Sequence, residues 1–160
     1  NPLKEAVVSV TEIHAGTASN IIPGTARLTA TIRSFDPEVR ALLKRRFHEI
    51  VEGTAAAHGV GAEITYDWGY PATVNDADKT AFAAEVAREV AGAAGVEEHG
   101  GREMGAEDFS YLLEKRPGAY LFLGQGDGAG LHHAAYDFND EAAPIGASFF
   151  ARLVERAQPL

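Results

Sequence analysis

Residues 26–51 read ARLTATIRSFDPEVRALLKRRFHEIV and set the architecture of the first half of the chain. Residues 26–33 alternate apolar and polar side chains, which is typical of a half-buried strand. Asp36 followed by Pro37 predicts a helix start, because Asp caps a helix N-terminus and Pro favours the first helical position. Apolar residues then recur at helical spacing, and Gly59 is the expected stop. The apolar positions are Val39, Leu42, Leu43, Phe47, Ile50 and Val51.

Two further segments of the first half alternate in the same way. These are residues 6–13, AVVSVTEI, and residues 62–68, AEITYDW, and both are predicted strands. A loop and the Pro23-Gly24 turn separate the first two strands, so we expect them to pair antiparallel. The expected unit is β-β-α-β with one sheet face covered by the helix, which is half of a split βαβ, ferredoxin-like arrangement.

The pattern breaks at Gly69-Tyr70-Pro71, where we place a boundary between domains 1–70 and 71–160. The second half alternates helices with one strand, which indicates a piece of an α/β layer and makes the fold class α/β. Its expected elements are helices near 77–90, 107–115 and 144–157 and a strand at 119–123. Both units look incomplete, and residue 1 is Asn rather than Met. We therefore expect the chain to be the later part of a longer protein.

The composition narrows the possible functions. The 160 residues carry a net charge of −9, which argues against nucleic acid or an anionic membrane as a partner. No apolar run approaches the roughly 20 residues that span a bilayer, and no signal peptide is visible, so cytoplasmic is the default location. The chain contains no Cys, so a metal site would have to use His, Asp, Glu or backbone oxygen.

The segment from Leu121 to Asp140, LFLGQGDGAGLHHAAYDFND, is the main candidate site. An apolar run leads into a glycine-rich turn with His132 and His133, which is a common way to present a metal ligand or catalytic group. An ordinary loop histidine is the alternative, and spacing alone favours it. A dinucleotide-binding loop is rejected, because that motif needs a helix to begin at its third small residue.

Other candidates are weaker on spacing alone. Arg33 could hold a substrate carboxylate by a bidentate pair, although most strand arginines only face solvent. Residues 103–109, EMGAEDF, combine a glycine turn with acids before a short helix. They could form a pocket wall, but helix capping and dipole complementarity are the favoured explanation for this segment alone.

Three segments together resemble one family. They are residues 14–23, HAGTASNIIP, followed by residues 29–35, TATIRSF; residues 104–109, MGAEDF; and residues 131–140, LHHAAYDFND. In order and spacing they resemble the dinuclear-metal aminoacylase/carboxypeptidase-type amidohydrolases. The similar branch is that of hippurate hydrolase and the indole-acetyl-amino-acid hydrolases, and the resemblance covers residues 2–157.

The resemblance implies a role for each half of the chain. Residues 1–70 would be part of a lid or dimerisation domain, and residues 71–160 the C-terminal segment of a catalytic domain. His132 matches the family's last metal ligand. Asn20 matches a lid residue that contacts substrate or the oxyanion, often in the partner subunit. Arg33 matches a lid residue for the substrate carboxylate, and Met104 and Gly105 match a loop lining the cleft.

The same resemblance implies a metal-dependent hydrolase of N-acyl amino acids or peptides that is a homodimer through its lid. The parent would use two divalent ions, Zn, Mn, Co or Ni. The family's other metal ligands and its general base match no position here, so we expect this chain alone to bind no metal and to be inactive. The alternatives are a non-catalytic dimerisation module and, more weakly, a small-molecule carrier using the Gly124–His132 loop.

Overall fold

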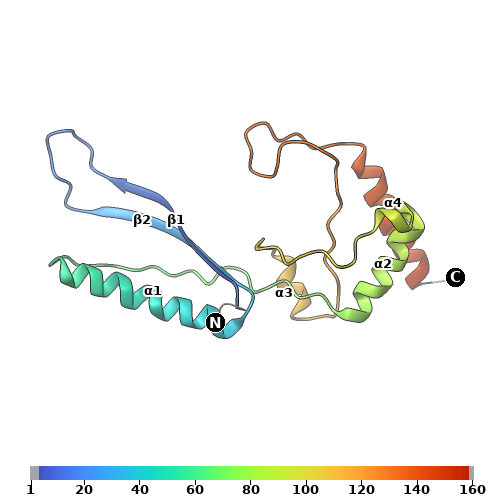
Figure 1. Cartoon of the computed structure of the whole chain (residues 1–160), viewed down its shortest axis with the longest axis horizontal. Coiled ribbons are helices and arrows are strands. Elements are labelled where there is room, and N and C mark those ends of the chain that lie inside the picture. The colour runs from blue at the N-terminus through green and yellow to red at the C-terminus, as the bar shows by residue number, and fades with distance from the viewer. Residues whose placement is uncertain (1–3, 159–160) are drawn as a thin grey trace. The chain divides into compact units, whose positions relative to one another are not determined.

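The computed structural model describes residues 4–158 (Figure 1). Its elements are strands β1 (Ala6–Ala15) and β2 (Ala26–Ser34), helices α1 (Pro37–Ala57), α2 (Ala77–Ala91), α3 (Phe109–Leu113) and α4 (Ala142–Ala157), and the 3-10 turn η1 (Ala93–Gly95). The expected α/β class is confirmed. The chain forms two compact units, Asn1–Ala72 with Glu103–Ala106, and Thr73–Arg102 with Glu107–Leu160.

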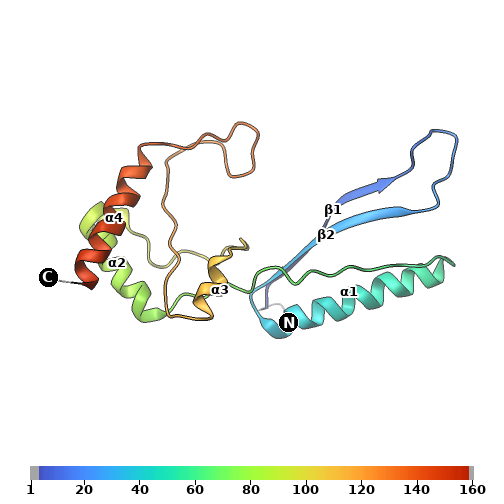
Figure 2. The same cartoon turned by 180° about the vertical axis from the view of Figure 1, so that it is seen from behind.

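In the first unit, β1 and β2 form the expected antiparallel hairpin. The register pairs Val7 with Arg33 and His14 with Arg27. It slips by one residue between Val10 and Glu12, so Thr11 is the extra residue of a bulge. The views of Figures 1 and 2 both show α1 running alongside this hairpin.

Helix α1 begins and ends where its sequence predicts. The Asp36 carboxylate accepts hydrogen bonds from the N–H groups of Glu38 and Val39. Its ion pair with Lys4, at 2.7 Å, is the largest cause that holds the pKa of Asp36 below its usual value. At the other end, Gly59 has a φ of +68°, and Val60 donates to the carbonyl of Ala55. This is a Schellman cap, which needs a residue in the left-handed region and therefore favours glycine.

The strand expected at residues 62–68 is absent, and that prediction was wrong. The residues are extended but pair with no strand in the described part of the chain. The segment instead lies against α1 through side chains. The Lys44 ammonium sits over the rings of Tyr66, at 5.0 Å, and Trp68, at 4.6 Å, and the Arg40 guanidinium lies 5.0 Å from Trp68. The alternation of apolar and polar side chains is explained here by one face of the segment packing on a helix, without hydrogen bonds to a neighbouring strand.

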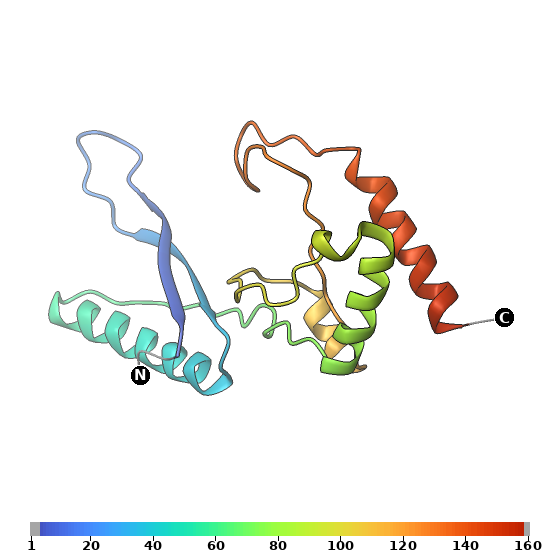
Figure 3. The same cartoon turned by 45° about the vertical axis from the view of Figure 1, so that its right-hand side comes forward.

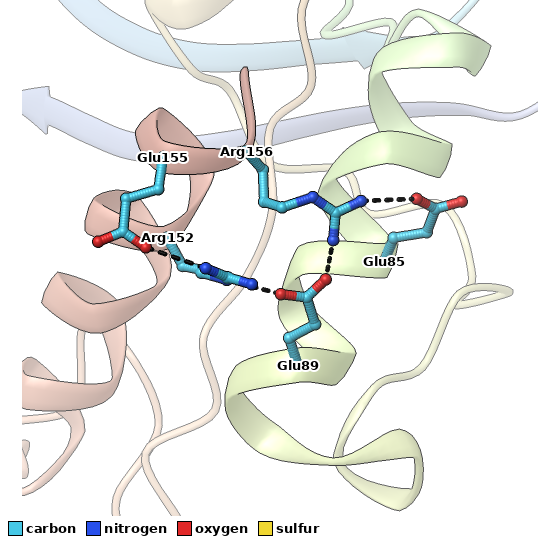
Figure 4. Close-up of polar contacts among 5 residues, drawn as sticks. All are labelled: Glu85, Glu89, Arg152, Glu155 and Arg156. Atoms are coloured by element: carbon cyan, nitrogen blue, oxygen red, sulfur yellow. Dashed lines mark hydrogen bonds and ion pairs between the residues drawn. The ribbon is translucent and has the colours of Figure 1, made fainter. Parts of the chain in front are cut away.

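In the second unit, α2 packs against α4, as the view in Figure 3 shows. Val86 of α2 is fully buried, with Ala83, Ala84 and Ala142 nearly so. At the surface of this contact, the two carboxylate oxygens of Glu89 bind Arg152, at 2.6 Å, and Arg156 (Figure 4). Arg156 also reaches Glu85 at 3.7 Å. The helices are thus joined by apolar burial inside and by an ion-pair network outside.

The strand expected at residues 119–123 is also absent, and that prediction was wrong as well. The described residues offer this segment no partner strand; its backbone bonds to a side chain instead. The amide of Asn75 accepts from the Tyr120 N–H and donates to the Tyr120 carbonyl. Asp76, which caps α2, donates its N–H to the Gly118 carbonyl at 2.9 Å. The apolar residues of the run remain partly exposed, with Phe122 at 74%.

The remaining helices match their predicted positions to within a few residues. Helix α4 begins at Ala142, two residues before Pro144, which the first turn tolerates because the backbone N–H of that position needs no helical partner. Over residues 4–158, every helix is too short or too polar to cross a bilayer.

Candidate functional site

The glycine-rich segment forms a loop that is closed at its base by two residues. Asn139 donates its side-chain amide to the Gln125 carbonyl at 2.9 Å and its backbone N–H to the Gln125 side-chain oxygen at 3.3 Å. The Tyr136 hydroxyl donates to the same oxygen at 3.3 Å. Gly126 begins the loop with a φ of +87°, a conformation that favours glycine. Residues 126–138 therefore form a defined surface loop that precedes α4 in the sequence.

His132 stands midway along the sequence of this loop with a φ of +67°, and it is the one non-glycine residue among those described with a positive φ. A left-handed backbone at a residue other than Gly is uncommon and often marks a functional position. The side chain is exposed, and within residues 4–158 nothing hydrogen-bonds its imidazole. Its neighbour differs, because the Nδ1 atom of His133 accepts from the Ala135 N–H at 3.0 Å. One of the two histidines is therefore free to bind a ligand.

An open cavity of about 510 Å³ lies at the base of the loop. Asp127, Asp137, Asp140 and Glu141 are among its lining residues, but His132 is not. The described residues contain no group of three or more His, Asp or Glu side chains able to hold a metal ion. A larger open groove of about 840 Å³ follows the Glu89 ion pairs on α2 and α4 and contains no candidate residue.

Two of the predicted site segments meet in the first unit. Arg33 is half-buried near the end of β2, and its Nη1 donates to the backbone carbonyl of Met104. Met104 is also half-buried, whereas Gly105 beside it is exposed. A Cβ built on Gly105 would meet nothing within 4 Å, so this glycine leaves open space beside the Arg33 contact.

Asn20 lies at the opposite end of the same hairpin, exposed in the connection between β1 and β2. Arg33 is seven positions along β2 from Ala26. A strand rises about 3.3 Å per residue, so Ala26 and Arg33 lie about 23 Å apart along β2, and Asn20 belongs to the connection that precedes Ala26. Asn20 and Arg33 of one chain are therefore placed at opposite ends of the hairpin.

A further polar contact was not expected from the sequence. Burial raises the pKa of the Tyr120 phenol above its usual value, and the nearby charges and hydrogen bond of Glu107, with Asp108, raise it further. The Tyr120 ring packs on Phe109 and Phe122 at 5.7 and 5.4 Å. Glu107 also accepts the buried Ser110 hydroxyl at its carbonyl, at 2.6 Å. The only sequence signal was the acidic pair in residues 103–109.

Comparison with known proteins identifies the class to which these segments belong. The sequence model of the family described as peptidase family M20/M25/M40 matches residues 3–156 of this chain. The chain therefore belongs to the M20 family of hydrolases.

Individual relatives include amidohydrolases. The chain is 35% identical over 153 residues to hippurate hydrolase of Campylobacter jejuni, covering 96% of this chain and 40% of that protein. It is 34% identical over 151 residues to N-acetylcysteine deacetylase of Bacillus subtilis, covering 94% and 39%. The Bacillus subtilis YxeP structure, described as a dinuclear metal-binding peptidase of this family, aligns with a TM-score of 0.68 at 32% identity. That alignment covers 95% of this chain and 42% of YxeP.

The predicted resemblance is thus confirmed. The chain spans about 40% of the length of the curated relatives that it matches. The structural relative binds two metal ions, which supports a divalent metal in the parent protein. The described residues of this chain do not by themselves form a site for such ions, because His132 stands alone among them.

Proposed function

We propose that this chain is the C-terminal part of a metal-dependent amidohydrolase that cleaves the amide bond of N-acyl amino acids. The observation that carries the proposal is the family match over residues 3–156, together with relatives that hydrolyse hippurate and N-acetylcysteine. Both substrates are N-acyl amino acids with a free carboxylate. Residues 1–70 act as a lid and residues 71–160 as the end of the catalytic domain.

Each candidate residue has one role in this proposal. His132 supplies one metal ligand through an imidazole that is exposed and unbonded in the described part of the chain. A metal ion in such a hydrolase supplies Lewis-acid activation of water. Arg33 has five N–H donors and uses one on Met104, so donors remain for the substrate carboxylate. Asn20 contacts the substrate or the oxyanion, and Met104 and Gly105 line the cleft.

The position of Asn20 also bears on assembly. Since Asn20 and Arg33 lie at opposite ends of the hairpin, a site that uses both residues needs two copies of the lid. This supports a homodimer through the lid, in which Asn20 reaches the site of the partner subunit. Cytoplasmic location is part of the proposal, with no membrane or nucleic acid as partner.

The isolated chain should be inactive, because one histidine cannot hold two metal ions and no general base is assigned. The test is hydrolysis of hippurate and N-acetylcysteine, with and without a chelator, by the native gene product and by the 160-residue chain.

The expected result is chelator-sensitive hydrolysis by the native gene product and none by the isolated chain. In the native product, His132→Ala should reduce hydrolysis at least about 100-fold, because loss of a residue that only supports a metal ligand already costs about 10–100-fold. The matched variant His133→Ala should reduce it by no more than about threefold. Absence of metal-dependent hydrolysis from the native product would overturn the proposal.

A non-catalytic dimerisation module is the second candidate. The open edges of the two-stranded sheet favour it, because unpaired backbone groups can pair with a second copy. The oligomeric state, measured by analytical ultracentrifugation at tens of micromolar protein, distinguishes the dimerisation module from the amidohydrolase when it is combined with the hydrolysis assay. A dimer without hydrolysis from the native product supports the module, and a monomer argues against it.

A further inference from the structure

The Arg33 side chain is bonded to the loop that the proposed function places at the cleft. Its Nη1 donates to the carbonyl of Met104, a residue 71 positions later in the sequence. Both residues belong to the first compact unit, which includes Glu103–Ala106 although the flanking sequence belongs to the second. The bond therefore joins β2 to a segment that comes from far along the chain.

The segment around Met104 has no regular structure to hold it. Residues 96–108 contain no helix or strand. The start of the segment is tied to α2 through the ion pair of Arg88 with Glu98, and its end is tied to α3 through Glu107 and Ser110. Between these ties, Met104 is half-buried while Glu103 and Gly105 on either side are exposed. A loop backbone of this kind depends on side-chain bonds for its position.

Arg33 is well suited to provide such a bond. Its backbone is fixed by the β1–β2 ladder, where it pairs with Val7, and its side chain is half-buried. A hydrogen bond from a charged donor to a carbonyl is stronger than one between neutral groups. The planar guanidinium also keeps a defined orientation when one of its donors is occupied.

We propose that Arg33 is a positioning residue that holds the Met104–Gly105 segment through the Met104 carbonyl, in addition to any contact with substrate. The inference rests on the proposed function for the assignment of this segment to the cleft. The bond itself is a property of the chain alone. Loss of Arg33 would therefore displace the segment even when no substrate is present.

Backbone nitrogen-15 relaxation of the purified 160-residue chain tests this inference, because the Arg33 bond holds a carbonyl and not an N–H group. Arg33→Gln should lower the order parameters of residues 103–106 from about 0.85 to below about 0.6, as expected when a held segment becomes flexible. The order parameters of β1 and β2 should not change. Arg33→Lys should restore the order parameters in part, because Lys keeps the charge and a donor but not the planar fork.

Two matched controls separate positioning from general effects of substitution. Arg27→Gln changes an exposed arginine of the same strand and the same face, and Gly105→Ala adds a methyl group where nothing lies within 4 Å. Neither should lower the order parameters at 103–106. Unchanged order parameters in Arg33→Gln with an intact hairpin would overturn the inference, as would loosening of the whole hairpin together with the segment.

A measurement on the unmodified chain covers the case in which Arg33→Gln does not fold. In nitrogen-15 NMR, a guanidinium held by a carbonyl rotates slowly and gives separate Nη signals. Arg33 should show separate signals and Arg27 one averaged signal. Averaged signals for both residues would overturn the inference. None of these measurements involves hydrolysis or metal, so their failure leaves the proposed function to be judged on its own assay.

Discussion

The side chain of Asn75 makes two hydrogen bonds with the backbone of Tyr120, accepting from its N–H at 2.8 Å and donating to its carbonyl at 2.9 Å. This is the pair of bonds that a neighbouring strand residue would make. One amide therefore replaces a strand at the edge of the segment 119–123. It also fixes that segment beside the start of α2, because Asp76 follows Asn75 directly and caps the helix.

Replacing Asn75 should destabilise the second unit. Asn75→Leu removes both bonds and should lower the free energy of unfolding by about 1–3 kcal/mol, since each net bond contributes about 0.5–1.5 kcal/mol. Asn75→Asp keeps the acceptor and should show roughly half of this loss. Denaturant titration measures the change. Val74→Ala, at a residue 70% exposed, is the control, and equal effects of Asn75→Leu and Val74→Ala would contradict the account.

Trp68 should report the contact between α1 and the segment 62–68. It is the single tryptophan of the chain, and Lys44 and Arg40 lie over its ring. Lys44→Met removes two cation–π contacts, worth about 0.5–1 kcal/mol each at exposed sites. Trp68 fluorescence should become more accessible to acrylamide in this variant. The control is Arg45→Met on the same helix, and an equal increase in both variants would refute the role of Lys44.

The Glu89 network should contribute modestly and be sensitive to salt. Glu89→Gln loses the bonds to Arg152 and Arg156 and should cost about 1 kcal/mol, because exposed pairs contribute about 0.2–1 kcal/mol each. The loss should largely vanish in about 1 M NaCl, where screening acts over about 3 Å. Glu155→Gln, which breaks only an i,i+3 pair with Arg152, should cost less. If a double-mutant cycle of Glu89 and Arg152 gave no coupling free energy, the network would make no contribution to stability through this pair, which would contradict the prediction.

The phenol of Tyr120 should ionise at a pH above the ordinary tyrosine pKa of 10.0. Burial and the carboxylates of Glu107 and Asp108 raise its pKa above the ordinary value of 10.0. The folded state then keeps a proton that the unfolded chain releases, so stability should fall as pH rises above 10.0. Tyrosinate absorbance should show a late step that Tyr120→Phe removes and Glu107→Gln moves to lower pH. A titration of the unmodified chain without a late step would disprove the shift.

The sequence predicted the helices well because their signals are local. Asp36, Pro37 and Gly59 act on backbone groups within one turn of themselves, so α1 follows from a few residues. Local signals of this kind could not decide whether residues 62–68 and 119–123 form strands. A strand exists only where another backbone lies beside it, and alternation in one segment says nothing about its partner. In place of a partner strand, the segment 62–68 has the contact of Trp68 with α1, and the segment 119–123 has the hydrogen bonds of Asn75.

In the candidate site, too, the sequence predicted some features and not others. The motifs around His132 and Met104 predicted the family, which the comparison with known proteins confirmed. The left-handed backbone of His132 and the bond from Arg33 to Met104 could not be predicted, because they depend on how the chain folds around each residue. The roles of Asn20, Arg33, Met104, Gly105 and His132 stay predictions that the variants described above address.

The most direct test of the central claim is the metal content per chain of the purified 160-residue protein after dialysis against trace Zn²⁺ or Mn²⁺. The account holds that this chain brings one ligand, His132, to a site completed by groups outside it. It therefore predicts close to zero tightly bound metal. Two tightly bound ions per chain would contradict the account, because a complete site would then exist among residues described here as structural.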